Sequence, residues 1–297
     1  MKPPAFEYVA AASVEEAASL LARHAGEAKL IAGGQSLVPM LNFRLLAPTV
    51  LVDINRVGGL DRIEELDRSE GGAGGLRIGA LVRHHALETS ALVKDRFPVL
   101  TAAMGHVAHL AIRNRGTIGG SLSHADPAAE LPAMVRLLDA TIEAVGAKGS
   151  RSIAAADFFE GALTTTLADD EIVTSIALPA LPPASGWGFE EFARRSGDFA
   201  LAGVAATVAL DGATVAEARI ALFGVNETPV RAAAAEALLA GQRHDPKLIE
   251  AAAAAVGEAI EPTDDLHASA GFRAHLAEVL TRRALAAAFE RAGGGVA

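Results

Sequence analysis

The stretch KLIAGGQSLVPM, from Lys29 to Met40, decides how the chain begins to fold. An apolar, strand-like run ends there at two adjacent glycines, Gly33 and Gly34, and polar residues follow them. A second block, RGTIGGSLSHADP, from Arg115 to Pro127, repeats the glycine pair. The chain therefore has two pairs of residues without side chains, far apart in the sequence. One explanation should account for both pairs.

Paired glycines after a strand have a chemical use. Glycine adopts positive φ and carries no side chain, so successive amide hydrogens can converge on one anion. Hydroxyl donors lie nearby at Ser36, Thr117, Ser121 and Ser123. The spacing matches neither the G-x-G-x-x-G turn of a Rossmann fold nor the G-K-[ST] of a P-loop. From the residues alone, a nucleotide or phosphate site and a pair of tight turns without a ligand both stay open.

Composition limits the class of protein. With 297 residues, 51% of them hydrophobic, the chain can bury a large core and divides into two or three units. The net charge of -10 argues against binding of nucleic acid. The absence of cysteine excludes cysteine-ligated iron–sulfur clusters in this chain. Neither a signal peptide nor an apolar run of roughly 20 residues is evident, so we expect a cytoplasmic protein.

Local patterns predict a mixed α+β N-terminal half. Ser13 and Glu16 open a helix at capping-box spacing, and the strands KLIA and VLVDI follow it. LDRIEEL and LRIGALV are predicted strands, and the glycines Gly71 to Gly75 between them are predicted to form a hairpin loop without a ligand. FPVLTAAMGHVAHLAIRNRG is predicted to be helical up to Gly116. Asp126 is predicted to cap a helical turn, and ATIEAVG and EIVTSIAL are typical of strands.

The segment PALPPASGWG is predicted to be a linker to a C-terminal part. Beyond it the pattern predicts three antiparallel strands with Asp211-Gly212 as a hairpin turn. The tail is predicted to be helical. Thr228-Pro229 starts one helix and Gly241 can end it, another begins near Pro246, and a third runs through FRAHLAEVLTRRALAAAFERA.

Individual polar residues carry less information than the two blocks. The histidines lack the spacing of a metal site, and we expect no metal. Asp126 can cap a helix, bind a cofactor or do both. Arg194 and Arg195 are expected to be surface or interface charges, and Trp187 is expected to pack.

At the two blocks the chain resembles a known family. LIAGGQSLVPMLNFRL and IRNRGTIGGSLSHADPAAELP resemble the two flavin loops of the FAD-binding medium subunit of molybdenum hydroxylases, the family of carbon monoxide dehydrogenase and xanthine dehydrogenase. FARRSGDFALA and HASAGFRAHLAEVLTRRAL resemble later segments of that subunit, so the resemblance covers nearly the whole chain. It implies the two-subdomain FAD-binding fold of the vanillyl-alcohol oxidase and p-cresol methylhydroxylase type. Residues 1–57 and 58–178 would be the subdomains, and 185–297 a C-terminal α+β domain.

The resemblance also implies which residues meet FAD. The first block would wrap the diphosphate, and the second would meet it from the other subdomain. Asp126 would bond the ribityl–ribose portion, and Phe199 would lie near the isoalloxazine ring. The full expected set is Ala32, Gly33, Gly34, Gln35, Ser36, Leu37, Val107, Thr117, Gly119, Gly120, Ser121, His124, Asp126, Val173 and Phe199. We expect valine at Gly33 or Gly119 to exclude the diphosphate and leave folded apoprotein.

Three positions depart from the family pattern. Ser121 stands where the family often has Asn, which shortens one side-chain contact or leaves it to water. Gln35 stands where similar carbon monoxide dehydrogenases have His, which weakens carbon monoxide as the substrate of the complex and leaves FAD binding intact. Phe199 replaces a Tyr of some relatives and can only stack or shield.

The function implied is electron transfer. A large partner subunit would carry a molybdopterin-type molybdenum cofactor, and a small one would carry two [2Fe-2S] clusters. FAD in this chain would take electrons from those clusters and pass them to quinone, NAD or oxygen. A dimer of heterotrimers is expected, and use of quinone would place the complex at the inner face of the membrane. No residue of this chain is expected to act as a general acid or base.

Two other functions stay open at this point. One keeps the fold and makes the chain a stand-alone flavin reductase like enolpyruvyl-glucosamine reductase, although no clear set of substrate acid and basic clamps is evident. The other is an assembly subunit that has lost FAD, against which the intact glycine pairs argue.

Overall fold

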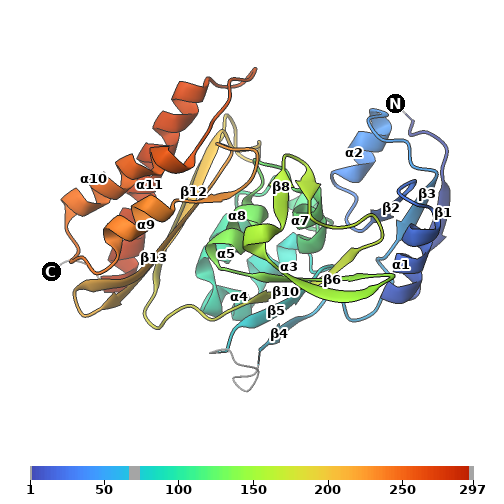
Figure 1. Cartoon of the computed structure of the whole chain (residues 1–297), viewed down its shortest axis with the longest axis horizontal. Coiled ribbons are helices and arrows are strands. Elements are labelled where there is room, and N and C mark those ends of the chain that lie inside the picture. Colours follow the sequence, from blue (N-terminus) through green and yellow to red (C-terminus); the bar gives the residue numbers. More distant parts are fainter. Residues whose placement is uncertain (1, 67–73, 294–297) are drawn as a thin grey trace. The chain divides into compact units, whose positions relative to one another are not determined.

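The computed structural model describes residues 2–66 and 74–293, so Gly71 and Gly72 of the predicted hairpin loop lie outside the described residues. The chain forms two compact units (Figure 1). Unit 1 consists of Met1–Leu87, His109–His124 and Ala140–Pro179, and unit 2 of Glu88–Ala108, Ala125–Asp139 and Ala180–Ala297. Segments 88–108 and 125–139 thus group with the C-terminal part, while the assignment of 1–57, 58–178 and 185–297 as functional domains stays a prediction.

Unit 1 begins with a small parallel sheet of order β1-β3-β2. Its strands are β1 (Glu7–Ala10), β3 (Val50–Asp53) and β2 (Ala28–Ile31), and helix α1 (Val14–Arg23) buries an apolar face against the same core. The Ser13 hydroxyl caps α1 by accepting from the Glu16 N–H at 3.2 Å. Because β2 and β3 are parallel neighbours, their carboxyl ends lie side by side. The first glycine pair follows one of these ends and Asp53 terminates the other.

The second sheet of unit 1 is antiparallel, with strand order β4-β5-β10-β6-β7. Its strands are β4 (Ile63–Glu65), β5 (Leu76–Gly79), β10 (Ile172–Leu178), β6 (Thr141–Gly146) and β7 (Gly149–Ala154). A separate two-stranded pair, β8 (Phe159–Gly161) and β9 (Thr164–Thr165), follows β7. The predicted strands of this half of the chain are therefore present, and they supply the surface on which the second glycine block packs.

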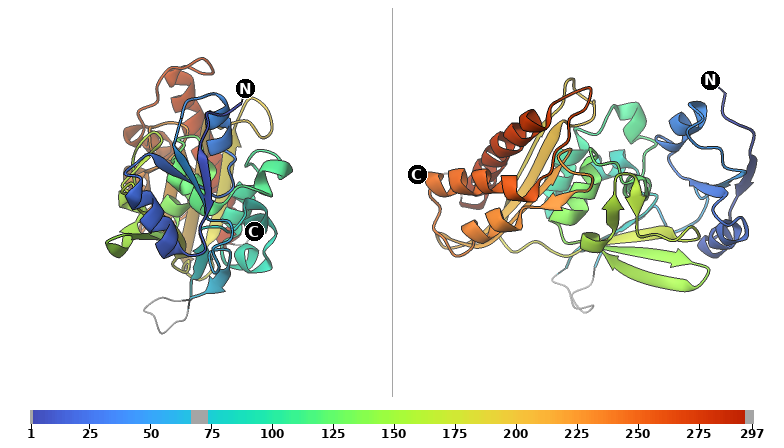
Figure 2. Two further views of the ribbon diagram at one scale, coloured as in Figure 1. Left: turned by 90° about the vertical axis from the view of Figure 1, so that its right-hand side faces the viewer. Right: turned by 45° about the horizontal axis from the view of Figure 1, so that its top comes forward.

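Unit 2 is built on an antiparallel sheet of order β11-β12-β13-β14. The long helix α11 (Ala270–Gly293) packs on β11 and β12, along one face of the sheet (Figure 2). Gly186 and Gly188 of β11 permit this approach, because a Cβ at either would overlap a backbone carbonyl of α11. The strands are β11 (Gly186–Phe192), β12 (Ala202–Asp211), β13 (Thr214–Phe223) and β14 (Val230–Arg231).

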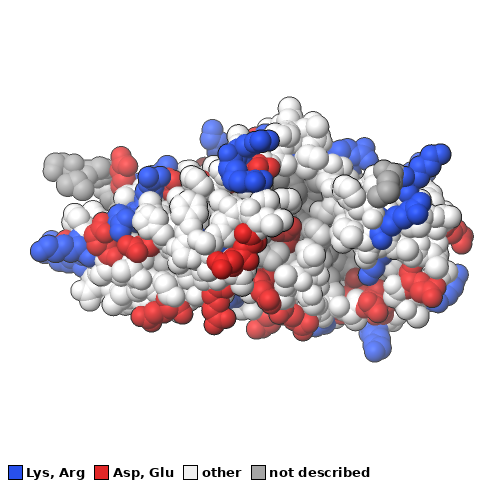
Figure 3. All heavy atoms as spheres, turned by 90° about the horizontal axis from the view of Figure 1, so that it is seen from above, with Lys and Arg blue, Asp and Glu red and all other residues white. Residues whose placement is uncertain are grey.

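The remaining helices are short. They are α2 (Leu37–Asn42), α3 (His84–Thr89), α4 (Ala91–Arg96), α5 (Pro98–Met104), α6 (Leu110–Arg113), α7 (Ile118–His124), α8 (Glu130–Leu137), α9 (Ala233–Leu239) and α10 (Pro246–Ala255), with 3₁₀ turns at Ala155–Asp157 and Val256–Ala259. Within the described residues, no helix combines the length and apolar character needed to cross a membrane. On the face drawn in Figure 3, acidic and basic side chains are interspersed.

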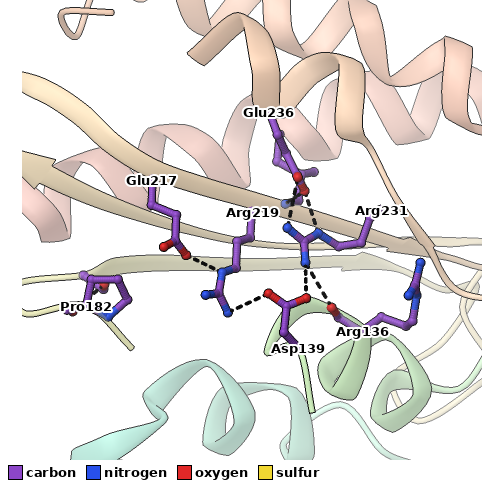
Figure 4. Close-up of polar contacts among 9 residues, drawn as sticks. Arg136, Asp139, Pro182, Glu217, Arg219, Arg231 and Glu236 are labelled. Carbon is purple, nitrogen blue, oxygen red and sulfur yellow. Dashed lines mark hydrogen bonds and ion pairs between the residues drawn. The ribbon is translucent and has the colours of Figure 1, made fainter. Parts of the chain in front are cut away.

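A polar cluster ties α8 to the sheet of unit 2 (Figure 4). Arg231 donates to Asp139 Oδ1 at 2.8 Å and to both carboxylate oxygens of Glu236, at 2.6 and 2.9 Å. Arg219 forms an ion pair with the other oxygen of Asp139 at 3.2 Å. The Arg231 fork thus joins the turn after α8 to the start of α9, and hydrogen bonds to Glu236 and Asp139 raise its pKa despite burial.

Three expectations about elements were wrong. Thr228-Pro229 starts no helix, because the chain there pairs with β13 as β14 and α9 begins only at Ala233. The C-terminal sheet consequently has four strands and not three. The helix predicted up to Gly116 is broken at Ala108, where φ is +42°. The expectation that Asp126 starts a helical turn is confirmed, since its carboxylate accepts from Ala128 N–H at 2.9 Å and its carbonyl from Ala129 N–H at 3.1 Å, and α8 begins separately at Glu130.

Candidate functional site

The first glycine block forms a turn lined with unused backbone donors. Gly34 has φ of +72°, so the turn needs a residue that tolerates the left-handed region. The Gln35 side chain fixes the turn by donating to the Gly33 carbonyl at 2.9 Å. In the part of the chain that the structure describes, the N–H groups of Gly33, Gly34, Gln35 and Ser36 donate to no protein oxygen. Successive free N–H groups in such a turn make an anion-binding concavity.

The second block lies directly against the first. A Cβ on Gly33 would overlap the carbonyl oxygen of Arg115 and lie 2.9 Å from the Cα of Gly116. Gly33, Arg115 and Gly116 all belong to unit 1, so this approach is made within one compact unit. The two segments are far apart in the sequence, and the missing side chain at Gly33 lets their backbones touch.

The glycine pair of the second block lies in a helix and not in a loop. Gly119 and Gly120 lie in α7, and neither has positive φ. The Gly119 N–H donates to the Ala80 carbonyl at 2.9 Å, and the Gly120 N–H donates to the Thr117 hydroxyl at 3.1 Å. These donors are already used, so the second pair does not repeat the chemistry of the first. Gly119 allows α7 to pack closely, since a Cβ there would lie 2.6 Å from that of Ala80.

Three further backbone and ring contacts hold the second block. His84 N–H donates to the Gly116 carbonyl at 3.0 Å, and Ile118 N–H to the Val82 carbonyl at 3.1 Å. The His84 ring lies under Gly116, where a Cβ would approach it to 2.8 Å. This ring is 7% exposed, neither nitrogen has a hydrogen-bond partner among the described residues, and burial lowers its pKa to about 4. His84 is therefore a neutral packing residue at physiological pH.

Polar side chains that the sequence did not single out connect the blocks. Arg83 donates to Asn55 Oδ1 at 2.7 Å and also to the Arg115 carbonyl. Asn55 donates to the Ala32 carbonyl at 2.8 Å and to Asp53 Oδ1 at 2.7 Å. One available signal was the position of Asp53 and Asn55 at the end of a strand parallel to the one before Gly33. Arg83 gave no such signal.

A hollow of about 360 Å³ lies over the first block. The residues that line it are Ile31, Ala32, Gly33, Gly34, Gln35, Val38, Pro39, Asn42, Asp53, Asn55 and Arg115. The wall is thus part backbone and part side chain, with one cation and one carboxylate. Burial opposes ionisation of Asp53, but hydrogen bonds from Tyr8 and Asn55 hold its pKa below the ordinary value. Asp53 is therefore negative at neutral pH.

The expected cofactor residues divide between the two units. Those in unit 1 are Ala32, Gly33, Gly34, Gln35, Ser36, Leu37, Thr117, Gly119, Gly120, Ser121, His124 and Val173, and those in unit 2 are Val107, Asp126 and Phe199. Phe199 is 70% exposed, which leaves its ring available for stacking, whereas Val173 is 4% exposed within β10. The roles of all these residues toward a cofactor stay predictions.

Unit 2 contains a buried acidic pair that sequence reasoning missed. The Glu191 side chain is 4% exposed, its Oε2 lies 3.8 Å from His106 Nδ1, and among the described residues this oxygen has no hydrogen-bond partner. Burial raises the pKa of Glu191 to about 7. Burial, together with the charges of Glu191 and Asp126, raises the pKa of Glu130 to about 8. The described residues, this acidic pair included, contain no group of three or more side chains suited to a metal ion.

Comparison with known proteins assigns both parts of the chain. Residues 4–181 match the model of the FAD binding domain in molybdopterin dehydrogenase, and residues 187–288 match the CO dehydrogenase flavoprotein C-terminal domain. The 6-hydroxypseudooxynicotine dehydrogenase complex subunit alpha of Paenarthrobacter nicotinovorans is 43% identical over 293 residues, covering 98% of this chain and 97% of that protein.

Two solved structures are similar over the whole length. Carbon monoxide dehydrogenase from Hydrogenophaga pseudoflava superposes with a TM-score of 0.94 at 39% identity, covering 98% of this chain and 99% of the other. Quinoline 2-oxidoreductase from Pseudomonas putida 86 gives 0.92 at 41% identity, covering 99% and 100%. The predicted fold class is thereby confirmed. The chain belongs to the family of FAD-binding medium subunits of molybdenum hydroxylases, and it is an oxidoreductase subunit whose cofactor is FAD.

Proposed function

We propose that this chain holds FAD by its diphosphate at the first glycine block and uses it to carry electrons between a partner subunit and an external acceptor. The observation that supports this most is the row of free N–H groups from Gly33 to Ser36, backed by the second block. Family membership alone would not say which atoms bind the diphosphate.

The residues present fit such a group. The chain has a net charge of -10, so a diphosphate must be neutralised locally. Hydrogen bonds to a charged group contribute about 1.5–3 kcal/mol each, so several free N–H groups suffice without a lysine. Arg115 adds a cation at the wall of the hollow. Asp53 also lines the hollow and would repel phosphate, so the anion is expected at the free N–H groups of the first block.

The partners follow from the cofactor set of the family. We propose a large subunit with a molybdopterin-type molybdenum cofactor and a small subunit with two [2Fe-2S] clusters, assembled as a dimer of heterotrimers. The lack of cysteine in this chain requires that cysteine-ligated clusters be held elsewhere. FAD supplies the redox chemistry, accepting electrons from the clusters and releasing them to quinone, NAD or oxygen. The side chains of this chain would bind FAD, orient it and shield it from water.

Copurification with partner subunits tests this proposal. The purified complex should show the visible absorbance of bound flavin, and the substrate of the large subunit should bleach it under anaerobic conditions. This chain alone, reconstituted with FAD, should not be bleached by that substrate, because electrons would have to arrive through the clusters. Colourless protein after reconstitution with FAD, or bleaching of the isolated chain by the same substrate, would contradict the proposal.

A further inference from the structure

Arg83 makes a fork that bridges two segments of the site. Its Nη2 donates to Asn55 Oδ1 at 2.7 Å, and its Nη1 donates to the carbonyl of Arg115, the residue before the second block's Gly116. An arginine side chain is suited to this task because its guanidinium is planar and holds several N–H donors in fixed directions. A lysine has one terminal nitrogen and cannot reach two separate acceptors with the same geometry.

Asn55 extends the connection to the first block. Its Nδ2 donates to the Ala32 carbonyl at 2.8 Å, immediately before Gly33, and to Asp53 Oδ1 at 2.7 Å. Asp53 in turn accepts from the Tyr8 hydroxyl at 2.6 Å and from the Asn55 N–H at 2.7 Å. The Asn55 amide therefore has its orientation fixed from both ends. One continuous series of hydrogen bonds leads from β1, through β3, to Ala32 in the first block and Arg115 in the second.

We propose that Asn55 and Arg83 form a clasp whose function is to fix the spacing of the two glycine blocks and so to set the affinity for the diphosphate of FAD. Both are positioning residues, since each donates to a backbone carbonyl within a block, Asn55 to Ala32 and Arg83 to Arg115. The inference rests on the proposed placement of the diphosphate.

The charge of Arg83 could act in place of its geometry. Burial and the nearby charge of Arg115 lower the pKa of Arg83, but an arginine stays protonated in proteins, so a cation is present beside the site. Simple attraction to a diphosphate would survive replacement by lysine. A geometric clasp would not, because it depends on two directed hydrogen bonds. The lysine variant therefore separates the two explanations.

The test compares FAD affinity in four variants of the full chain: Arg83→Gln, Arg83→Lys, Asn55→Ala and the double variant Asn55→Ala with Arg83→Gln. Arg62→Gln is the matched control, because Arg62 lies in the same unit and forms an exposed ion pair with Glu64 at 3.8 Å. Dissociation constants are measured by flavin fluorescence on apoprotein that circular dichroism shows to be folded.

The clasp predicts that Arg83→Gln and Arg83→Lys each weaken FAD binding by at least about tenfold, as the loss of a directed charged hydrogen bond would. Asn55→Ala should weaken it similarly, and the double variant should lose less than the product of the single losses. Amide hydrogen exchange at Arg115 and Gly116, whose N–H groups donate to the Ile112 carbonyl, should become faster in the apoprotein of these variants. Arg62→Gln should change neither quantity.

Two results would overturn the inference. One is FAD affinity within about twofold of wild type in Arg83→Gln and Asn55→Ala. The other is full recovery of affinity in Arg83→Lys, which would assign the effect to charge. If Arg83→Gln does not fold, Asn55→Ala decides by the same criteria. Failure of the proposed function looks different, since the wild-type protein would then bind no FAD, or would bind it without protecting 33–36 from exchange.

Discussion

The glycines of the two blocks differ in what they do. Gly34 has positive φ, Gly33 leaves room for the backbone of Arg115, and Gly119 leaves room for Ala80. The expectation that valine at Gly33 or Gly119 would give folded apoprotein is therefore unsound. Both substitutions would push a side chain into backbone before any ligand arrives, so loss of FAD from them would report on folding.

Replacing Gly33 by alanine should destabilise the apoprotein itself. A Cβ there would overlap the Arg115 carbonyl, and overpacking of this kind costs about 1–3 kcal/mol. Gly58→Ala is the control, since it lies in the same unit with open space around its Cβ position and no positive φ. Urea unfolding of apoprotein should show the loss for Gly33→Ala only. Equal stability of the two variants would mean that the blocks do not touch.

The partly buried acid Glu130 should make stability depend on pH. The pKa of this carboxyl is raised from 4.5 to about 8 in the folded protein, so the folded state keeps a proton that the unfolded chain has lost. The contribution of Glu130 to the free energy of unfolding should therefore be greatest below about pH 4.5. It should fall as pH rises toward 8, by up to about 1.4 kcal/mol per pH unit.

Glu130→Gln removes that proton binding while keeping the shape of the side chain. Its unfolding free energy should decline less between pH 5 and pH 8 than that of the wild type, and at pH 8 the variant should be the more stable protein. In this variant the unfolding free energy should still decline with pH, but less steeply, because burial raises the pKa of Glu191 to about 7. A wild-type stability that rises over this range would show that the carboxyl is ionised in the folded state.

The residues of the site were only partly predictable. Glycine pairs are visible in a sequence because their composition is unusual, and the first pair predicted its turn correctly. Asn55 and Arg83 were not visible, because their importance lies in hydrogen bonds to carbonyls far along the chain. Glu130 and Glu191 were missed for a similar reason, since a charged residue in sequence gives no sign that folding will bury it.

Predictions of helices and strands from local sequence patterns were correct where the hydrophobic periodicity matches the element that forms. The helix opened by Ser13 and the long C-terminal helix form as predicted, and so do the strands predicted at KLIA, VLVDI, LRIGALV, ATIEAVG and EIVTSIAL. The failures have tertiary causes. Pairing with β13 draws the residues after Thr228-Pro229 into β14, and packing on Ala80 makes a helix of the second block that its glycines disfavour in isolation.

The contact between β11 and α11 gives a prediction for unit 2. Gly188→Ala should lower the free energy of unfolding of unit 2 by about 1–3 kcal/mol, because the new Cβ would overlap the Ala284 carbonyl of α11. Gly257→Ala is the control, with no atom near its Cβ position. Chemical unfolding followed by Trp187 fluorescence reports on this unit, since Trp187 belongs to β11. Unchanged stability in Gly188→Ala would mean that α11 lies further from the sheet.

The molecule as a whole combines an acidic chain with a site for an anion. Its net charge of -10 gives no general attraction for a diphosphate, so binding depends on the local arrangement of N–H groups. That arrangement needs three segments of unit 1 to meet: the turn after β2, the end of β3 and the segment around Arg115. Family resemblance predicted that the first and last of these would share one ligand, and the fold places them in contact.

The most direct test of this account is an NMR titration of apoprotein labelled with ¹⁵N-glycine, using ADP as the probe because it carries the diphosphate without the flavin. The amide signals of Gly33 and Gly34 should shift strongly and saturably, while those of Gly212 and Gly241, both in unit 2, should stay in place. Saturable binding of ADP that leaves Gly33 and Gly34 unmoved would show that the diphosphate is held elsewhere, and the account of the site would be wrong.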